Sequence, residues 1–583
     1  MTKSIIYSAS SYTELRRDNG YFVDKTEYIA KLERVKNAIF LRPRRFGKSF
    51  MCSMLHAYYD VRGKDEFEEL FGDTWIGQNP TGQQSKYIIL HLNFSDIEPG
   101  PTLADIEASF KGICNEAIDL LRVQYAPLLD ALPPMDLNAP VSRNLSRLTK
   151  YTEAMGWPPL YVIIDEYDNF ANQLIINRNM QLYHQLTDDT SFLKTFFKVL
   201  KSGREIGAIY NIYITGILPI TIGDLASAFN IGTYLTLDPT FEAMIGFTQP
   251  EVDSLLDQIF EDFTLNETMI TGENRAEIGD LIKANYNGYH FVRLPEHDES
   301  TAVYNTTILM YFLRYLTEHR EVTIHLADSN LKTDVGWYRL LNDANPELGK
   351  TLVDQLMFTE QVEYSPTMLT SRFRVAQFFD AGYFQTALFY LGLLTRQSSF
   401  RLTFPNHNMH EVFVEYFNER YKLNTSDPFK PAAEAFIQQP DLEMLFHAYW
   451  QEYIGKLPEA IFTQVNENFY RTTFYEVCMR NLHEWFTWNL ERSYPKGKSD
   501  LEFVGKHHQQ FAGMRWVIEF KYYSKKKMRE EDVDVKTFAL QKDDTKQING
   551  YVEGLIHEYP EANVSKFVIY CFANVDFRIF EVD

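Results

Sequence analysis

The chain is long and acidic, with 583 residues, 79 Asp and Glu against 57 Lys and Arg, and a formal net charge of −22. Its length favours several domains, and its 45% hydrophobic and 15% aromatic content excludes global disorder. The net charge argues against a protein that coats nucleic acid along its whole length.

Neither a membrane span nor a disulfide framework is expected. No apolar run approaches the roughly 20 residues that a membrane helix needs, and the N-terminus lacks the apolar centre of a secretory signal. The cysteines form no CxxC pair and are far apart in the sequence: Cys52, Cys114, Cys478 and Cys571. We therefore expect a protein of the reducing cytoplasm, without structural zinc.

Short apolar strands separated by helical segments run through the first 250 residues. We expect strands at 38–41, 87–94, 160–164 and 209–216, and the apolar spacing of residues 50–58 predicts a helix behind the first strand. This alternation is typical of an α/β domain with a mainly parallel sheet, which we expect over residues 1–250.

Residues 42–49, RPRRFGKS, lie between the first strand and that helix. The ending is that of a P-loop, in which Lys48 would reach the β- and γ-phosphates, Ser49 would bind Mg²⁺, and Gly47 would permit the tight turn. Arg42 stands where such a loop normally begins with glycine. We expect a phosphate cradle with a modified rim rather than a chance GKS on a basic surface loop. The expected nucleotide-binding residues are Arg44, Arg45, Phe46, Gly47, Lys48 and Ser49.

Polar residues follow the third and fourth expected strands. Asp165 ends the run LYVII, where it can hold Mg²⁺, and Glu166 beside it can polarise the attacking water. The alternative, a solvated acidic turn, is disfavoured by the P-loop upstream. Thr215 is a candidate contact for the γ-phosphate, although an ordinary strand-end threonine is nearly as well supported. Arg204 is a weaker candidate for an arginine finger.

The rest of the chain changes character twice. Residues 251–455 are helical and aromatic in pattern, which predicts a helical lid or linker region. From residue 456 short strands return at 500–505, 515–523 and 566–573, with a helix at 546–559. We expect a second, smaller α/β domain over residues 456–583.

This last segment carries a second group of candidate residues. Asp500 opens one strand, and Glu519 and Lys521 lie two apart on the next, so both point to the same face. One Asp, one Glu and one Lys on adjacent strands can hold Mg²⁺ and place a water for attack on phosphorus. Glu476, on the preceding helix, is the candidate that completes the metal shell. The alternative is an exposed strand with alternating charges.

A basic run surrounds these carboxylates. Residues 492–529 contain ten Lys and Arg against three acidic residues, a local balance of +7 (10 − 3). Such a surround would hold a nucleic-acid backbone by charge, without reading base edges.

Several motifs together resemble one family. FVDKTEYI at 22–29, FLRPRRFGKS at 40–49 and VIIDEYDN at 162–169 are similar to the bacterial AAA-ATPase-like family whose P-loop reads RPRRFGKS. NYNGYHF at 285–291 and VYNTT at 303–307 resemble its later motifs. In that family the altered first loop position is ordinary, and members commonly carry a C-terminal nuclease-like domain of the PD-(D/E)XK superfamily.

The resemblance covers nearly the whole chain and is thinnest between about 320 and 455. It implies ATP and Mg²⁺ as cofactors, Mn²⁺ as an alternative at the nuclease site, bacterial origin, and a role in defence against foreign DNA or in DNA processing. Ser499 stands before the aspartate where proline is usual. The residues that match the superfamily are Asp500, Glu519 and Lys521 of its D…ExK signature, Glu476 as its helical glutamate, and Gln547 with Tyr551 on its late helix.

Three function classes stay open at this point. The favoured one is an ATP-binding and ATP-hydrolysing protein with a metal-dependent nuclease domain that acts on nucleic acid, with DNA favoured over RNA. The second is an NTP-driven switch whose C-terminal domain binds nucleic acid or protein without cleaving it. The third is a scaffold with two decayed sites, against which the intact candidate residues argue. The sequence also leaves open whether the protein forms a homo-oligomer.

Overall fold

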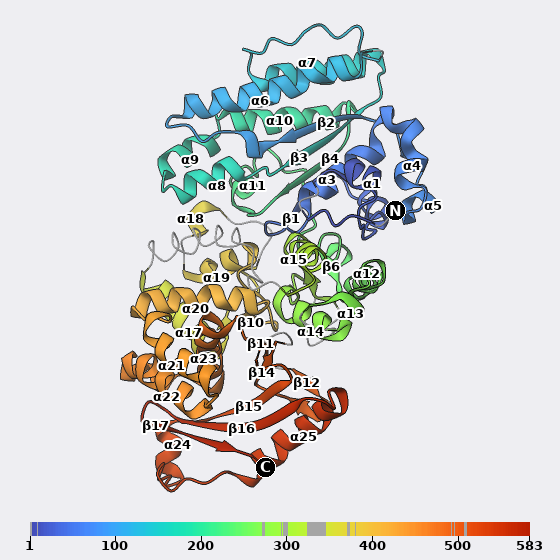
Figure 1. Cartoon of the computed structure of the whole chain (residues 1–583). Helices are drawn as coiled ribbons and strands as arrows, with labels where there is room; N and C mark the ends of the chain where they lie inside the picture. Colours follow the sequence, from blue (N-terminus) through green and yellow to red (C-terminus); the bar gives the residue numbers. More distant parts are fainter. Residues whose placement is uncertain are drawn as a thin grey trace.

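The computed structural model describes residues 3–582 except 8–9, 127, 271–273, 293, 295–300, 323–345, 370–373, 379–380, 491, 495 and 507–509. The chain forms an N-terminal α/β part, a middle region and a C-terminal α/β part, arranged in succession along the molecule (Figure 1). Within the described ranges no helix combines the length and apolar character that crossing a bilayer requires.

The N-terminal part is built on a five-stranded parallel sheet of order β2-β3-β4-β1-β5. Its strands are β1 (Ala38–Leu41), β2 (Ile88–Asn93), β3 (Leu160–Asp165), β4 (Ile209–Gly216) and β5 (Thr233–Tyr234). Every residue of β1 and β3 is buried, as continuous apolar runs in a covered parallel sheet must be. The carboxyl ends of the strands therefore meet at one edge, where the P-loop follows β1.

Helices cover both sides of this sheet. Figure 1 shows α6 (Leu103–Gln124), α7 (Val141–Met155) and α10 (Phe192–Glu205) as one layer, and α3 (Lys48–Tyr59) lies away from them. The remaining helices of this part are α1 (Tyr12–Arg17), α2 (Glu27–Leu32), α4 (Phe67–Phe71), α5 (Trp75–Gln78), α8 (Asn169–Ile176), α9 (Met180–Thr187) and α11 (Ile220–Asp224).

The middle region is mainly helical, as expected, but it also contains short strands. Residues of β8 (Gln361–Glu363), β9 (Thr395–Arg396) and β10 (Arg401–Thr403) form a small antiparallel sheet, and β6 (Phe247–Thr248) pairs with β7 (Val303–Tyr304). The helices are α12 (Gln249–Asp262), α13 (Leu265–Thr268), α14 (Arg275–Tyr286), α15 (Thr306–His319), α17 (Pro346–Thr359), α18 (Val375–Phe378), α19 (Ala381–Tyr390), α20 (His407–Tyr421), α21 (Lys430–Gln438) and α22 (Leu442–Glu452).

The C-terminal part has a sheet of order β11-β14-β15-β16-β17, in which only β15 and β16 are parallel. Phe520 of β15 packs toward Phe474 on one face, and Val517 packs with Ile548 on the other, so α23 and α25 cover opposite faces. The elements are α23 (Glu467–Leu482), β11 (Phe486–Leu490), β12 (Ser493–Tyr494), β13 (Gly497–Lys498), β14 (Leu501–Gly505), β15 (Met514–Tyr523), α24 (Lys525–Glu530), α25 (Lys542–Glu558), β16 (Asn563–Phe572) and β17 (Asp576–Glu581).

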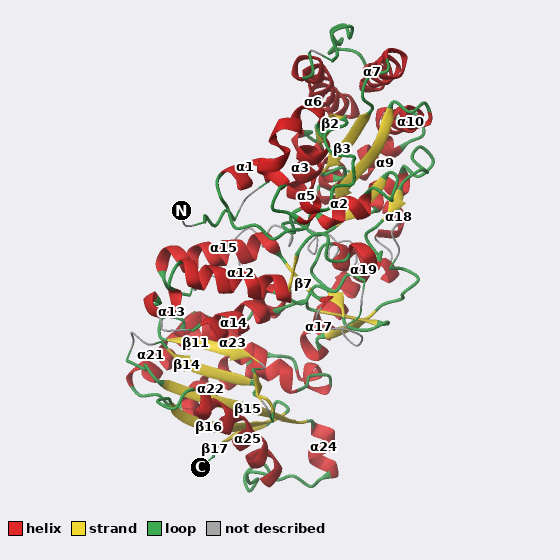
Figure 2. Ribbon diagram, turned by 90° about the vertical axis from the view of Figure 1, so that its right-hand side faces the viewer, coloured by secondary structure: helices red, strands yellow, loops and turns green. Residues whose placement is uncertain are grey.

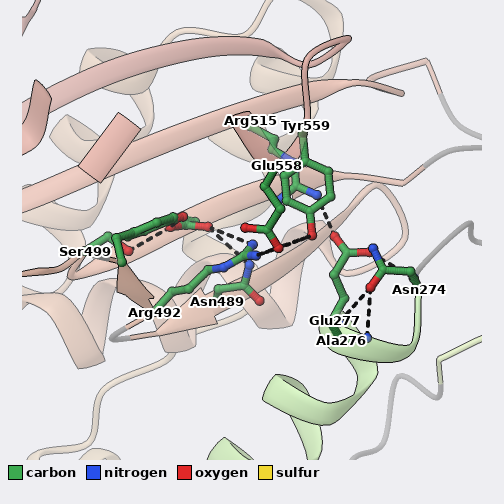
Figure 3. A network of polar contacts seen from close by, with 11 residues as sticks. Asn274, Ala276, Glu277, Asn489, Arg492, Ser499, Arg515, Glu558 and Tyr559 are labelled. Atoms are coloured by element: carbon green, nitrogen blue, oxygen red, sulfur yellow. Dashed lines mark hydrogen bonds and ion pairs between the residues drawn. The ribbon is translucent and has the colours of Figure 1, made fainter. Parts of the chain in front are cut away.

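The C-terminal sheet contacts the start of α14 through a polar network (Figure 3). Glu277 accepts a hydrogen bond from the backbone N–H of Asn274 at 3.0 Å and another from the Arg515 guanidinium at 2.7 Å. The same guanidinium lies 3.6 Å from the centre of the Tyr559 ring. Figure 2 shows the sheet directly below α14, so the middle region separates the two α/β parts and touches both.

Candidate nucleotide and phosphodiester sites

The P-loop turns at the first residues of α3. Gly47 has a φ of 97°, a left-handed conformation that other residues rarely adopt, and it directly precedes Lys48, the first residue of the helix. The buried Lys48 ammonium donates to the carbonyl oxygen of Pro43 at 3.1 Å and lies 3.4 Å from a carboxylate oxygen of Glu166. The loop therefore presents a cation and a helix N-terminus at the edge of the sheet.

The end of β3 brings two carboxylates to the same place. The Ser49 hydroxyl is hydrogen-bonded to Asp165, and burial raises the pKa of Asp165, an effect that this hydrogen bond opposes. Glu166 follows with a φ of 51°, and its backbone N–H donates to Asp165 at 2.9 Å. The turn thus directs one carboxylate at Ser49 and the next at Lys48.

Thr215 lies near the end of β4, between β3 and β1. It is fully buried, and its hydroxyl has no hydrogen-bond partner within the described part of the chain. Arg204, by contrast, donates to the carbonyl oxygen of Ile209 at 2.6 Å, at the start of β4. Because the P-loop lies at the carboxyl ends of the strands, the arginine is at the opposite edge of this sheet.

Arg42 is a core residue rather than a rim residue. Its side chain is 1% exposed, and the guanidinium donates to the carbonyl oxygens of Leu41 at 3.0 Å and Thr236 at 2.9 Å. It also lies 4.1 Å from the centre of the Phe291 ring, and burial lowers its pKa to about 10. Arg42 therefore does not line the phosphate cradle, and the residues after it form the modified rim of the P-loop.

The later family motifs support this loop from behind, a contact that sequence reasoning missed. Asn305 donates to the carbonyl oxygen of Arg44 at 3.3 Å, and Thr306 donates to that of Arg45 at 3.1 Å. The Phe46 ring is buried and packs edge-on against Tyr289 at 4.9 Å between centres. Residues more than 240 positions away thus fix the loop, and only the family resemblance of these motifs marked them.

Asp168, inside the DEYDN motif, positions the end of β4. The carboxylate is fully buried and accepts hydrogen bonds from the backbone N–H groups of Ile217 at 3.2 Å and Leu218 at 2.7 Å. Burial raises its pKa to about 6. The carboxylate also lies so close to Gly216 that a β-carbon there would approach it to 2.3 Å, which explains the glycine.

An apolar cavity of about 100 Å³ lies beside the loop. Its walls come from the segment before β1, from α3, from the residues after β5 and from the start of α15. They include Phe22, Phe46, Gly47, Phe50, Met51, Ile245 and Thr306.

In the C-terminal part, Asp500 directly precedes β14 and lies beside Glu519 and Lys521 of the neighbouring strand β15. The backbone N–H of Phe520 donates to Asp500 at 2.7 Å, and the Lys521 ammonium donates to Glu519 at 2.8 Å. Gln547 of α25 donates to the same Glu519 oxygen at 2.6 Å. Tyr551 also hydrogen-bonds Gln547, so the late helix carries the residues that hold Glu519 and Lys521 in place.

Glu519 combines burial with an unused oxygen. It is 3% exposed, and its second carboxylate oxygen has no hydrogen-bond partner among the described residues. Burial and the neighbouring Asp500 carboxylate raise the pKa of Glu519 to about 8. Two carboxylates that repel each other, one with a free buried oxygen, form a donor set that suits a divalent cation.

Glu467, exposed at the start of α23, lies within electrostatic reach of this site, whereas the sequence pointed to Glu476. Burial and the charge of Asp500 raise the pKa of Glu467, and Lys521 lies near enough to oppose this. Glu476 instead forms an ion pair with Arg480, and its charge acts on Glu411 of α20. The two glutamates are nine residues apart, which at 3.6 residues per turn puts them about 180° apart around α23.

Part of the basic run is paired within the protein. Lys496 forms an ion pair with Glu553 of α25, and Lys525 forms one with Glu459. Lys498 is exposed, and no carboxylate pairs with it in the described ranges. The surface charge available to a partner is therefore smaller than the count of +7 suggests.

Two family models match separate parts of the chain. Residues 6–226 match the family model described as "Predicted AAA-ATPase", and residues 465–581 match that of the PD-(D/E)XK nuclease superfamily. Among solved structures, the Aeropyrum pernix ORC2 protein in its ADPNP-ADP complexes is matched at 13% identity, over 70% of this chain and 94% of that chain, with a TM-score of 0.27. No curated protein matches this sequence.

Proposed function

We propose that this chain is an ATPase and a nuclease. It carries an AAA-ATPase-like domain, which binds and hydrolyses ATP, followed by a PD-(D/E)XK nuclease superfamily domain, which cuts nucleic acid, with DNA favoured over RNA as the substrate. The domains that we assign to these activities span residues 1–250 and 456–583, with 251–455 as the region between them. Four buried free cysteines fit a reducing compartment such as the cytoplasm. Defence against foreign DNA or DNA processing would suit this pair of activities.

In the first domain, Lys48 would hold the β- and γ-phosphates while the backbone of residues 44–49 surrounds them. Ser49 and Asp165, already hydrogen-bonded to each other, would hold Mg²⁺. Glu166 would orient the attacking water, and Thr215 would use its unpartnered hydroxyl on the γ-phosphate or on that water. The buried hydroxyl supports this role, because a buried polar group without a partner costs free energy in the fold alone.

The apolar cavity beside the loop suits the base of the nucleotide. Phe22, Phe50 and Ile245 offer flat and aliphatic surface next to Gly47, so a base placed there leaves its phosphates at the start of α3. This assignment explains why residues before β1 and after β5 enclose the loop.

In the second domain, the free buried oxygen of Glu519 beside Asp500 is the observation that carries the proposal. Asp500, Glu519 and Glu467 would hold a divalent metal, which supplies charge neutralisation and activation of a bound water. Lys521, fixed by Glu519 and Gln547, would orient that water or stabilise the negative charge that develops on phosphorus.

Nucleotide binding is tested by calorimetry on the full chain. Lys48→Ala should abolish ATP binding, because it removes the cation from the β- and γ-phosphates, while Glu166→Gln should keep binding and stop phosphate release. Equal affinity of the wild type and Lys48→Ala for ATP would refute the assignment of the P-loop.

Cleavage is tested with plasmid, ATP and Mg²⁺ or Mn²⁺. Asp500→Ala and Glu519→Ala should each eliminate cleavage, because each removes a hard oxygen ligand, and both variants should still bind DNA. If the wild type binds DNA in an ATP-dependent way and never cuts it, the protein is the non-cleaving switch that the sequence left open.

A further inference from the structure

A second cavity lies between the middle region and the C-terminal domain. Its volume is about 500 Å³, within the range of sites that hold small molecules. One wall comes from α14 and the residues before α20, and the other comes from α23, β11 and the segment before Asp500. Neither candidate site described above includes this space.

The cavity is electropositive although the chain is acidic. Its permanently charged residues are Lys283, Arg471, Arg492 and Lys498 on the cationic side, against Asp280 and Glu360. Arg471 and Arg492 have carboxylate partners, in Glu360 at 3.4 Å and Glu558 at 2.8 Å. Lys283 and Lys498 are exposed and form no ion pair within the described ranges, although the charge of Asp280 acts on Lys283. Two cations on opposite walls therefore face the space.

Aromatic side chains complete the walls. Trp488 of β11 lines the cavity, and its indole N–H is buried with no hydrogen-bond acceptor among the described residues. Phe404, on the side of the middle region, lines it as well. Cations together with aromatic surface and an unused donor match the chemistry of a nucleotide, which offers phosphate oxygens and a flat base.

Arg471 connects this cavity to the candidate metal centre. It lines the cavity, and its guanidinium also lies 3.6 Å from a carboxylate oxygen of Asp500. Arg471 and Glu467 are four residues apart on α23, so they project from the same face of the helix. A strand with its phosphate at Asp500 would therefore have its neighbouring nucleotide close to this cavity.

We propose that this cavity binds an unpaired nucleotide of the strand next to the phosphate that is cut, so that the C-terminal domain acts on single-stranded or locally opened nucleic acid. Lys283 and Lys498 hold phosphates from the two sides, and Trp488 and Phe404 face the base. A paired base stays stacked inside its duplex, so only an unpaired or extruded base can enter a space enclosed between two domains. This inference rests on the proposed nuclease function and names its substrate class.

The test measures binding of the full chain by fluorescence anisotropy in EDTA, where metal-dependent cleavage cannot occur. The probes are a labelled single-stranded oligonucleotide and the blunt duplex of the same sequence. The test variant is Lys283→Ala with Lys498→Ala. The matched control is Lys430→Ala with Lys456→Ala, which removes two exposed lysines outside the basic run, whose carboxylate partners are Asp427 and Glu452.

We expect the test variant to lose about tenfold in affinity for the single strand, and the plot of log K against log salt to become shallower by about 1.4, since each phosphate contact to a single strand contributes about 0.7. The control variant should keep both affinity and slope. Trp488→Phe should weaken binding without changing the slope, because it removes the indole N–H and leaves the charge.

Three results would overturn the inference. In the first, test and control variants bind the single strand equally well. In the second, the test variant loses duplex binding as much as single-strand binding. In the third, a free nucleoside monophosphate binds the wild type in a Lys498-dependent way without displacing the strand, which would assign the cavity to a free nucleotide. Loss of all nucleic-acid binding and cleavage in the wild type itself would instead refute the nuclease function.

Discussion

At the scale of single residues, Glu467 and Glu476 show that the face of a helix on which a glutamate lies decides whether it can take part in a site. Both are glutamates of α23, Glu467 exposed and Glu476 buried, and the sequence around Glu476 resembles the helical glutamate of the superfamily. Only Glu467 lies near Asp500 and Lys521, while Glu476 pairs with Arg480. The choice between them depends on the rotation of α23 against β15, which no local pattern specifies.

This difference predicts opposite results for two identical chemical changes. Glu467→Gln should reduce metal-dependent cleavage by about 10- to 100-fold, as loss of a group that supports a metal site does. Glu476→Gln should leave the cleavage rate unchanged, because its carboxylate is on the far side of the helix. Initial rates over a range of Mn²⁺ concentrations measure both, and a loss of cleavage in Glu476→Gln alone would contradict the assignment.

The sequence predicts residues best where function follows a strand end. Lys48, Asp165 and Thr215 all lie at the carboxyl ends of parallel strands, which meet at one edge whatever the rest of the chain does. The support of the loop by Tyr289, Asn305 and Thr306 could not be derived this way. Those contacts join segments more than 240 residues apart, and they appear only when the middle region is packed against the loop.

At the scale of elements, α20 and α23 pack acidic side chains against each other. Burial and the charge of Glu476 raise the pKa of Glu411 to about 8, from an ordinary value of 4.5. Arg480 offsets part of this repulsion by pairing with Glu415 and Glu476. Between these two pKa values the folded chain binds a proton at Glu411 that the unfolded chain has lost.

The free energy of unfolding should therefore fall as the pH rises from about 4.5 to about 8. Glu411→Gln should reduce this dependence, because the amide stays neutral, while the part that comes from Glu519 and Asp168 remains. We expect equal melting temperatures for the variant and the wild type at pH 4.5, and a higher melting temperature for the variant at pH 8. Differential scanning fluorimetry across this range, with the exposed Glu443→Gln as control, measures it. A constant difference at every pH would contradict the argument.

Long strands were easier to foresee than short or mixed ones. The expected strand at 209–216 coincides with β4, and that at 515–523 differs from β15 by one residue. The three strands of the β8-β10-β9 sheet have only two or three residues each, too few for a period to show. β11, with FTWNL, and β17, with DFRIFE, mix polar and aromatic residues, and they are fixed by pairing with β14 and β16 rather than by an apolar period of their own.

At the scale of the whole molecule, α14 joins the two candidate sites. Glu277, in its first turn, binds Arg515 of the C-terminal sheet (Figure 3), and Tyr289, just after its last residue, packs against Phe46 of the P-loop. One 12-residue helix therefore contacts both domains through its ends. A change of the loop on nucleotide binding would act on the far sheet through a rigid element.

We predict that nucleotide state changes nucleic-acid affinity through this contact. The affinity of the wild type should differ between ATP and ADP by about 5- to 150-fold, the usual range of such coupling. Glu277→Gln should reduce that ratio, because it removes the ion pair with Arg515. Anisotropy titrations with ATP, ADP and no nucleotide measure it, with Glu267→Gln on the exposed surface of α13 as control. The same ratio in wild type and Glu277→Gln would exclude this route.

The support of the P-loop by residues 289–306 also bears on how such a chain can be assembled by genetic exchange. A recombination that joined residues 1–250 to a foreign second half would keep every nucleotide-binding side chain and lose the partners of Arg44, Arg45 and Phe46. The hybrid would inherit the motif without the fold that shapes it. To keep the shape of the loop, an exchange would have to carry residues 1–250 together with the segment that holds Tyr289, Asn305 and Thr306.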